Sequence, residues 1–131
     1  MLYTSYFGKV KKLPENIIPV SIAAITPRWF QGKSYKHLAP TFELLNDWKI
    51  GAVTEEKYTE RFNAQLEKLN PRDVVEELKY VLPATCISTV FWEDPSISVA
   101  LLCYESKGFC HRHLVANWFT EYGIHCEEVI I

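Results

Sequence analysis

Reactive side chains of four kinds lie close together near the end of the chain. Cys103 and Glu105 end one segment, and Cys110, His111 and Arg112 begin the next. A thiol beside basic groups at a helix amino terminus ionises readily, so Cys110 is predicted to be a catalytic nucleophile or a redox thiol. His111 is predicted to be its partner, and Glu105 to be either a general base or the group that orients Arg112. The alternative for Cys110 is a small buried residue that only packs.

Arg112 is predicted to bind the anionic group of a substrate. A guanidinium holds phosphate or carboxylate through two parallel hydrogen bonds, and the free N–H groups of a helix amino terminus add to such binding. The alternative is a salt bridge to Glu105 or to another nearby carboxylate.

Neither a metal nor a cofactor is expected from the spacing of the cysteines and histidines. Cys103, Cys110, His111 and His113 form a C-x6-C-H-x-H pattern that matches no familiar zinc framework. Two histidines separated by one residue point to different sides of a helix, so at most one should face the site. Cys103 ends an apolar run and is expected to pack.

Two elements position these residues. Residues 99–103 are almost continuously apolar, which is typical of a buried strand in a parallel sheet. Residues 111–122 have the spacing of an amphipathic helix that Gly123 ends. In open α/β sheets ligands bind at the carboxyl ends of strands, so this junction predicts an anion-binding crevice.

The opposite wall of the crevice is predicted to come from two earlier segments. Thr4, Ser5 and Tyr6 end a first strand, and Arg28 follows a second apolar run. If both strands lie parallel to residues 99–103, these side chains converge with Arg112 as substrate-binding residues.

The remaining pattern alternates strands with helices. Helices are expected from Leu38, with Pro40 in the first turn, from a Thr54 cap and from an Asn70 cap. Strands are expected at 2–7, at 17–25 with Pro19 delaying the strand proper to Val20, and at 127–131. Residues 86–92 form either a strand or an irregular loop. This order predicts one α/β domain over residues 1–131, a three-layer Rossmann-like domain with a mainly parallel sheet.

Composition limits the classes of partner. The 131 residues carry a net charge of −2, so no overall basic field favours nucleic acid, although a local basic patch is compatible with it. The four cysteines form no C-x-x-C pair, and we expect reduced thiols. No signal peptide and no membrane span are expected, and the predicted location is the cytoplasm.

The segment from Leu101 to Glu105, followed by Cys110-His-Arg112, resembles the signature of the domain-of-unknown-function family numbered 488. That family comprises small, mostly bacterial and phage-encoded α/β proteins, and the resemblance implies the same fold and the same site. Its second strand usually ends in Asp-x-Arg, whereas here Arg28 follows Thr-Pro. Its early Gly-His-Ser is replaced by Tyr6-Phe-Gly8. An activity that needs that aspartate or histidine is not expected here.

Three functions follow from these features. The first is an enzyme that acts on a small phosphate-bearing, nucleotide-related substrate. The second is a non-catalytic module that binds a nucleotide or a nucleic-acid end. The third is a protein-interaction domain that uses the aromatic residues Trp29, Trp48 and Trp92.

Overall fold

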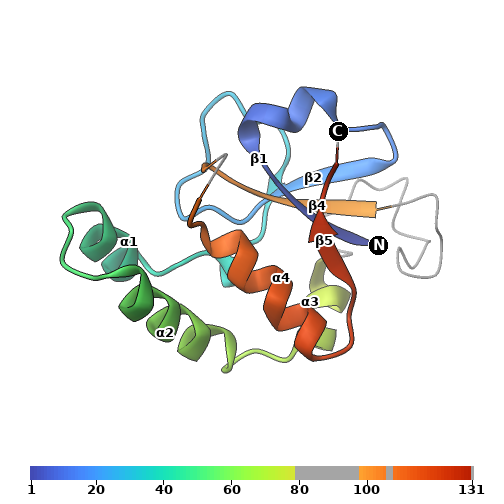
Figure 1. The fold of residues 1–131 in the computed structure, drawn as a ribbon. Helices are drawn as coiled ribbons and strands as arrows, with labels where there is room; N and C mark the ends of the chain where they lie inside the picture. The colour runs from blue at the N-terminus through green and yellow to red at the C-terminus, as the bar shows by residue number, and fades with distance from the viewer. Residues whose placement is uncertain (79–97, 106–107, 131) are drawn as a thin grey trace.

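The computed structural model describes residues 1–78, 98–105 and 108–130. In these residues the strands form one parallel sheet of five, in the order β3-β2-β4-β1-β5 (Figure 1). The strands are β1 (Leu2–Tyr6), β2 (Ile17–Ser21), β3 (Lys33–Ser34), β4 (Ser98–Cys103) and β5 (Cys126–Glu128). The predicted α/β fold with a parallel sheet is therefore confirmed.

β4 is the centre of the sheet. It pairs with β1 on one side and with β2 on the other, and every residue of β4 is buried. Leu101 packs in a large core on one face and Leu102 in a smaller core on the other, and both are 0 % exposed. The strand predicted at 99–103 is confirmed, and its continuous apolar sequence reflects burial on both faces.

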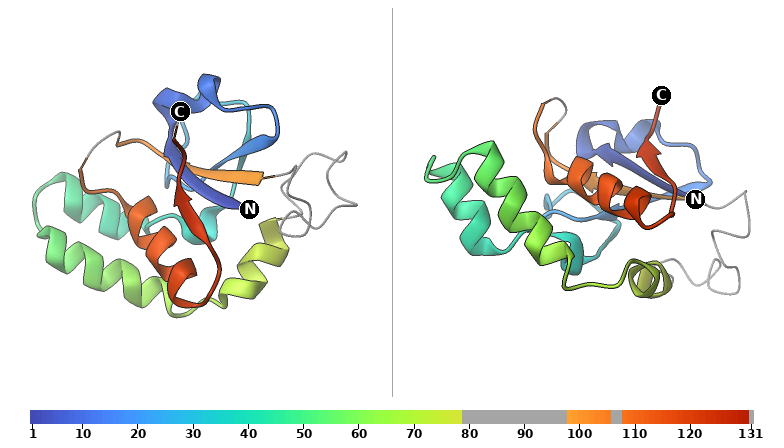
Figure 2. Two further views of the ribbon diagram at one scale, coloured as in Figure 1. Left: turned by 45° about the vertical axis from the view of Figure 1, so that its right-hand side comes forward. Right: turned by 60° about the horizontal axis from the view of Figure 1, so that its bottom comes forward.

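The two faces of the sheet are covered by different structures, which makes three layers (Figure 2). The described α-helices pack on one face, and the 3-10 helix η1 (Phe7–Lys12) covers the other together with the loop after β2. The helices are α1 (Phe42–Lys49), α2 (Glu55–Leu66), α3 (Pro71–Leu78) and α4 (His111–Glu121).

Local capping signals set several helix ends as predicted. The Thr54 hydroxyl accepts a hydrogen bond from the backbone N–H of Lys57, and the Asn70 side chain accepts one from the N–H of Arg72. Gly123 follows α4 with a φ of 81°, a left-handed conformation that glycine adopts without strain.

The helix predicted from Leu38 begins later than expected. Residues Lys36–Leu38 form a short 3-10 helix, η2, and α1 starts at Phe42, where the Thr41 hydroxyl caps the N–H of Leu44. Pro40 explains the delay, because a proline disfavours helical backbone in the residue before it, and Ala39 is extended.

Two predicted strands have different limits. β2 contains Pro19, which was expected to lie outside the strand proper. β3 pairs only with Val20 and Ser21, so one edge of β2 is unpaired at Pro19. The missing N–H of proline therefore removes no hydrogen bond to β3. β5 lies at Cys126–Glu128 and not at 127–131. Residues 86–92, predicted to be a strand or a loop, lie outside the described residues.

Truncating either central leucine should destabilise the protein. Because both side chains are fully buried on covered faces, we expect Leu101→Ala and Leu102→Ala each to lower the free energy of unfolding by about 2–5 kcal/mol. Denaturant unfolding measures both, with Ile130→Ala as a control because Ile130 is 96 % exposed. A near-neutral result for only one leucine would mean that one face is not packed.

Candidate functional site

The candidate site lies at the carboxyl edge of the sheet, where the chain leaves two neighbouring strands in opposite directions. β2 leads to β3 at one edge of the sheet. β4 leads through α4 to β5 at the opposite edge (Figure 1). Such a topological switch point is where open α/β sheets bind ligands. It is the strand–helix junction that the sequence predicts.

Two cysteine sulfurs meet at this edge. Cys103, the last residue of β4, forms a disulfide with Cys110, the residue that precedes α4. The expectation of reduced thiols is therefore wrong for this pair, and Cys103 does more than pack. Cys110 is only 3 % exposed, because the start of α4 is held against the sheet.

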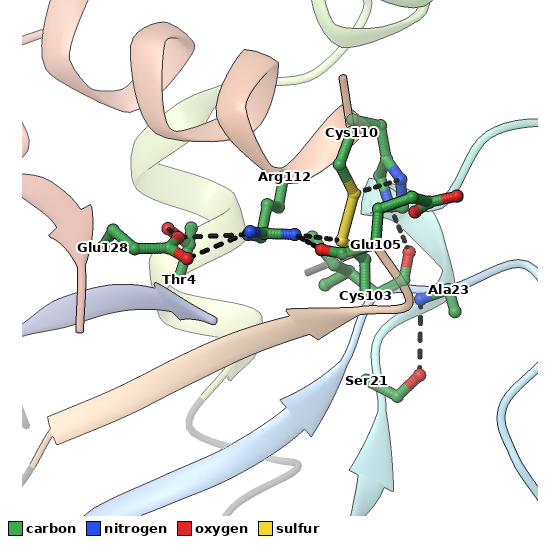
Figure 3. Close-up of a disulfide and its surroundings, with 10 residues drawn as sticks. Thr4, Ser21, Ala23, Cys103, Glu105, Cys110, Arg112 and Glu128 are labelled. Atoms are coloured by element: carbon green, nitrogen blue, oxygen red, sulfur yellow. Dashed lines mark hydrogen bonds and ion pairs between the residues drawn. A yellow bond between two sulfur atoms is a disulfide. The ribbon is translucent and has the colours of Figure 1, made fainter. Parts of the chain in front are cut away.

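A buried guanidinium holds that helix start in place (Figure 3). Arg112 is 1 % exposed, and its Nε and Nη2 each donate to one carboxylate oxygen of Glu128 at 3.0 Å. Its Nη1 donates to Cys103 Sγ at 3.1 Å and to the backbone carbonyl of Glu105. Arg112 therefore forms the salt bridge that was the alternative to substrate binding, and its partner is Glu128. Glu105 accepts only through its backbone carbonyl, and its side chain is exposed.

Two residues of β1 complete this ion pair. The Thr4 hydroxyl donates to Glu128 Oε1 at 2.6 Å, and the guanidinium of Arg112 lies 5.6 Å from the centre of the Tyr6 ring. Burial acts to raise the pKa of Glu128, but the hydrogen bonds from Arg112 and Thr4 lower that pKa below its ordinary value overall. Thr4 and Tyr6 therefore reach the site, where they contact the ion pair.

His111 connects the site to the loop after β2. Its Nε2 donates to the carbonyl of Ile22 at 2.7 Å, and its Nδ1 lies 3.9 Å from Cys110 Sγ. Burial lowers the pKa of His111 to about 4, so the ring is neutral at pH 7. His113 is exposed, which agrees with the expectation that only one of the two histidines faces the site.

Two predicted substrate-binding residues lie apart from this cluster. Ser5 is fully buried, belongs to the face of β1 opposite Thr4, and has no hydrogen-bond partner for its hydroxyl among the described residues. Arg28 is exposed in the loop after β2. Substrate binding by Arg28, by Ser5 and by Arg112 stays a prediction.

Glu128 was not identified from the sequence as the partner of Arg112, and Cys103 was assigned only a packing role. Glu128 ends β5, which lies beside β1, so the position of its carboxylate depends on strand order. The available signal was a pair of glutamates near the end of a short terminal strand.

Three donor atoms of the site lie within reach of a single ion. Cys103 Sγ, Cys110 Sγ and a ring nitrogen of His111 are all within 4.8 Å of one another, and all three side chains are buried. The linear spacing of these residues did not predict this grouping.

Comparison with known proteins supports the resemblance seen in the sequence. The family model DUF488-N3a, described as the active DUF488-N3 subclade, matches residues 8–123. No curated protein and no solved structure matches the chain significantly. Among the described helices, none combines the length and the apolar character that a membrane span needs.

Removing the charge of Glu128 should leave the charge of Arg112 buried and unpaired. We therefore expect Glu128→Gln to lower the free energy of unfolding by about 3–5 kcal/mol. The neighbouring Glu127 is exposed, and Glu127→Gln should change this free energy by less than about 0.5 kcal/mol. Equal effects of the two substitutions in denaturant unfolding would contradict a structural role for the ion pair.

The buried neutral ring of His111 should make stability depend on pH. Below pH 6.5 the unfolded chain takes up a proton at this histidine that the folded chain does not take up until pH is about 4. The free energy of unfolding should therefore fall over this interval, by up to about 3 kcal/mol from this group. His111→Gln should remove that part of the slope, and His125→Gln, at an exposed position, should keep it.

Proposed function

The chain belongs to the DUF488-N3a family, and on that basis we propose that it is a thiol-dependent enzyme for a small phosphate-bearing, nucleotide-related substrate. The observation that carries the proposal is the meeting of Cys103 and Cys110 at the switch point of the sheet. The family model is described as an active subclade, which supports catalysis over binding alone.

The two sulfurs suit redox chemistry. In the proposed cycle the substrate carries a bond that thiols reduce, such as a disulfide. That bond breaks and takes up two electrons and two protons, while the S–S bond between Cys103 and Cys110 forms. An external dithiol then reduces the disulfide, forms its own disulfide and restores both thiols. Arg112 is a positioning residue, because its N–H group on Cys103 Sγ stabilises that sulfur when it carries negative charge.

An anionic substrate is supported by the surroundings of the site. The start of α4 has no acidic residue in its first turn and no side-chain cap, so the positive end of the helix dipole favours an anion nearby. A cavity of about 500 Å³ lies beside the loop after β2, and its wall includes Ala24, Lys36, Lys68 and the exposed ring of Phe42 but none of the residues around the two cysteines. Its volume is in the range of small-molecule sites, and Lys68 and the ring of Phe42 suit a nucleotide, whereas Lys36 already donates to the carbonyls of Ala23 and Ala24.

The proposal predicts an activity that depends on both cysteines. The reduced protein is incubated with a panel of nucleotides and an external dithiol, in the presence of a metal chelator, and the products are identified by mass spectrometry. We expect Cys103→Ser and Cys110→Ser each to lower turnover by more than about 100-fold.

Cys126→Ser is the matched control for these variants. Cys126 is buried and unpaired, and burial raises the pKa of its thiol to about 12, so it should be unreactive. Wild-type turnover in both serine variants, or the absence of turnover on every nucleotide tested, would overturn the thiol mechanism.

One observation favours a non-catalytic binding module as the second candidate. Both sulfurs are buried and the donors of Arg112 are used within the protein, so the disulfide can serve as a staple across the site. In that case a nucleotide would raise the melting temperature of wild type and of Cys110→Ser equally, without any product. Lys68→Ala would then reduce the shift, and Lys49→Ala, on the exposed side of α1, would not.

A further inference from the structure

The three donors at the site have the chemistry of a zinc site. Two thiols and an imidazole are soft or borderline ligands, which favour Zn²⁺ over Mg²⁺ or Ca²⁺. Cys103, Cys110 and His111 place these donor atoms within 4.8 Å of one another, and the three side chains are buried. They come from the end of β4 and the start of α4, two elements that packing holds together.

The orientation of His111 is the one that a metal-binding histidine needs. Its Nε2–H is fixed by the carbonyl of Ile22 at 2.7 Å, which leaves the Nδ1 lone pair on the side of the sulfurs. Such an outer hydrogen bond sets the tautomer and the ring orientation in metal sites. The separation of Nδ1 from Cys110 Sγ is 3.9 Å. Two such ligands on one tetrahedral zinc lie about 3.6 Å apart.

The backbone leaves room for an ion between the sulfurs. The Cα atoms of Cys103 and Cys110 are 7.4 Å apart. Directly bridged cysteines usually have a Cα separation of about 4.4–6.8 Å. Once the sulfur–sulfur bond is reduced, the two side chains can therefore separate without requiring the strand and the helix to move apart.

Charge balance at this edge also favours a dication. Arg112 is neutralised by its ion pair with Glu128, so two buried thiolates would add two uncompensated negative charges. Zn²⁺ cancels both charges. The N–H group of Arg112 that donates to Cys103 Sγ then serves as the outer hydrogen bond to a metal-bound thiolate.

We infer that the reduced protein binds one Zn²⁺ through Cys103, Cys110 and His111, with the fourth position left to water or to a small ligand. Binding releases the two thiol protons to solvent. Formation of the disulfide uses both sulfurs, so a two-electron oxidant of thiols expels the ion, and reduction by an external dithiol restores the site. The metal site and the disulfide are therefore alternative states of the same two cysteines.

Zinc binding is tested with the metal alone. Protein reduced by a dithiol and freed of metal and reductant is titrated with Zn²⁺ against a chromophoric chelator, and bound zinc is counted by elemental analysis. We expect one zinc per chain for wild type and for Cys126→Ser. Cys103→Ser, Cys110→Ser and His111→Gln should each weaken binding by more than about tenfold, since loss of an outer partner alone costs about 10–100-fold.

A second measurement uses wild type alone, so its result does not depend on whether the variants fold. In wild type, Zn²⁺ should slow alkylation of Cys103 and Cys110 by iodoacetamide, as mapped by peptide mass, and should leave alkylation of Cys126 unchanged. Oxidised wild type should bind no zinc. Absence of zinc from reduced wild type, or protection of all three cysteines to the same extent, would overturn the inference.

The zinc site needs only the reduced thiols and does not depend on turnover. The enzymatic test is run with a chelator and the zinc test without substrate, so either proposal can fail alone.

Discussion

The buried charge of Arg112 is the constraint on which the site depends. A guanidinium taken out of water destabilises a fold unless it is paired and its donors are hydrogen-bonded. Here the carboxylate of Glu128 supplies the opposite charge, and Cys103 Sγ and the carbonyl of Glu105 accept from the remaining nitrogen. These partners belong to β5, to β4 and to the segment after β4. The hydrogen bonds of the Arg112 side chain therefore fix β5, β4 and the segment after β4 relative to α4.

The same contacts bring the reactive groups together. Because α4 begins one residue before Arg112, docking this side chain also places Cys110 against Cys103 and turns His111 toward Ile22. The loops after β2 and β4 lead to opposite edges of the sheet, and ligands bind where loops diverge in this way. The arginine thus acts on the site through geometry, and direct binding of a substrate by Arg112 stays a prediction.

In both proposals the oxidation state of the sulfur pair decides what the site does. The disulfide neither donates electrons nor binds zinc, whereas the dithiol supports both. Zinc would occupy the two thiols that the proposed enzyme uses, so the two activities compete for one pair of side chains. The availability of a dithiol reductant and of free zinc would then set the fraction of active protein.

Much of the fold follows from sequence because its signals are local. The apolar run of β4, the caps at Thr54 and Asn70, and the helix end at Gly123 each depend on residues only a few positions apart. The strand–helix junction of the site is predictable for the same reason, since β4 and α4 are adjacent in the chain.

The partners within the site were decided by tertiary structure alone. The ion pair of Arg112 with Glu128 needs β5 to lie beside β1, and the hydrogen bond of His111 to Ile22 needs β2 to lie beside β4. The meeting of Cys103 with Cys110 needs α4 held against the sheet. No pattern of neighbouring residues specifies these contacts, because they depend on strand order and on the cost of leaving a buried charge unpaired.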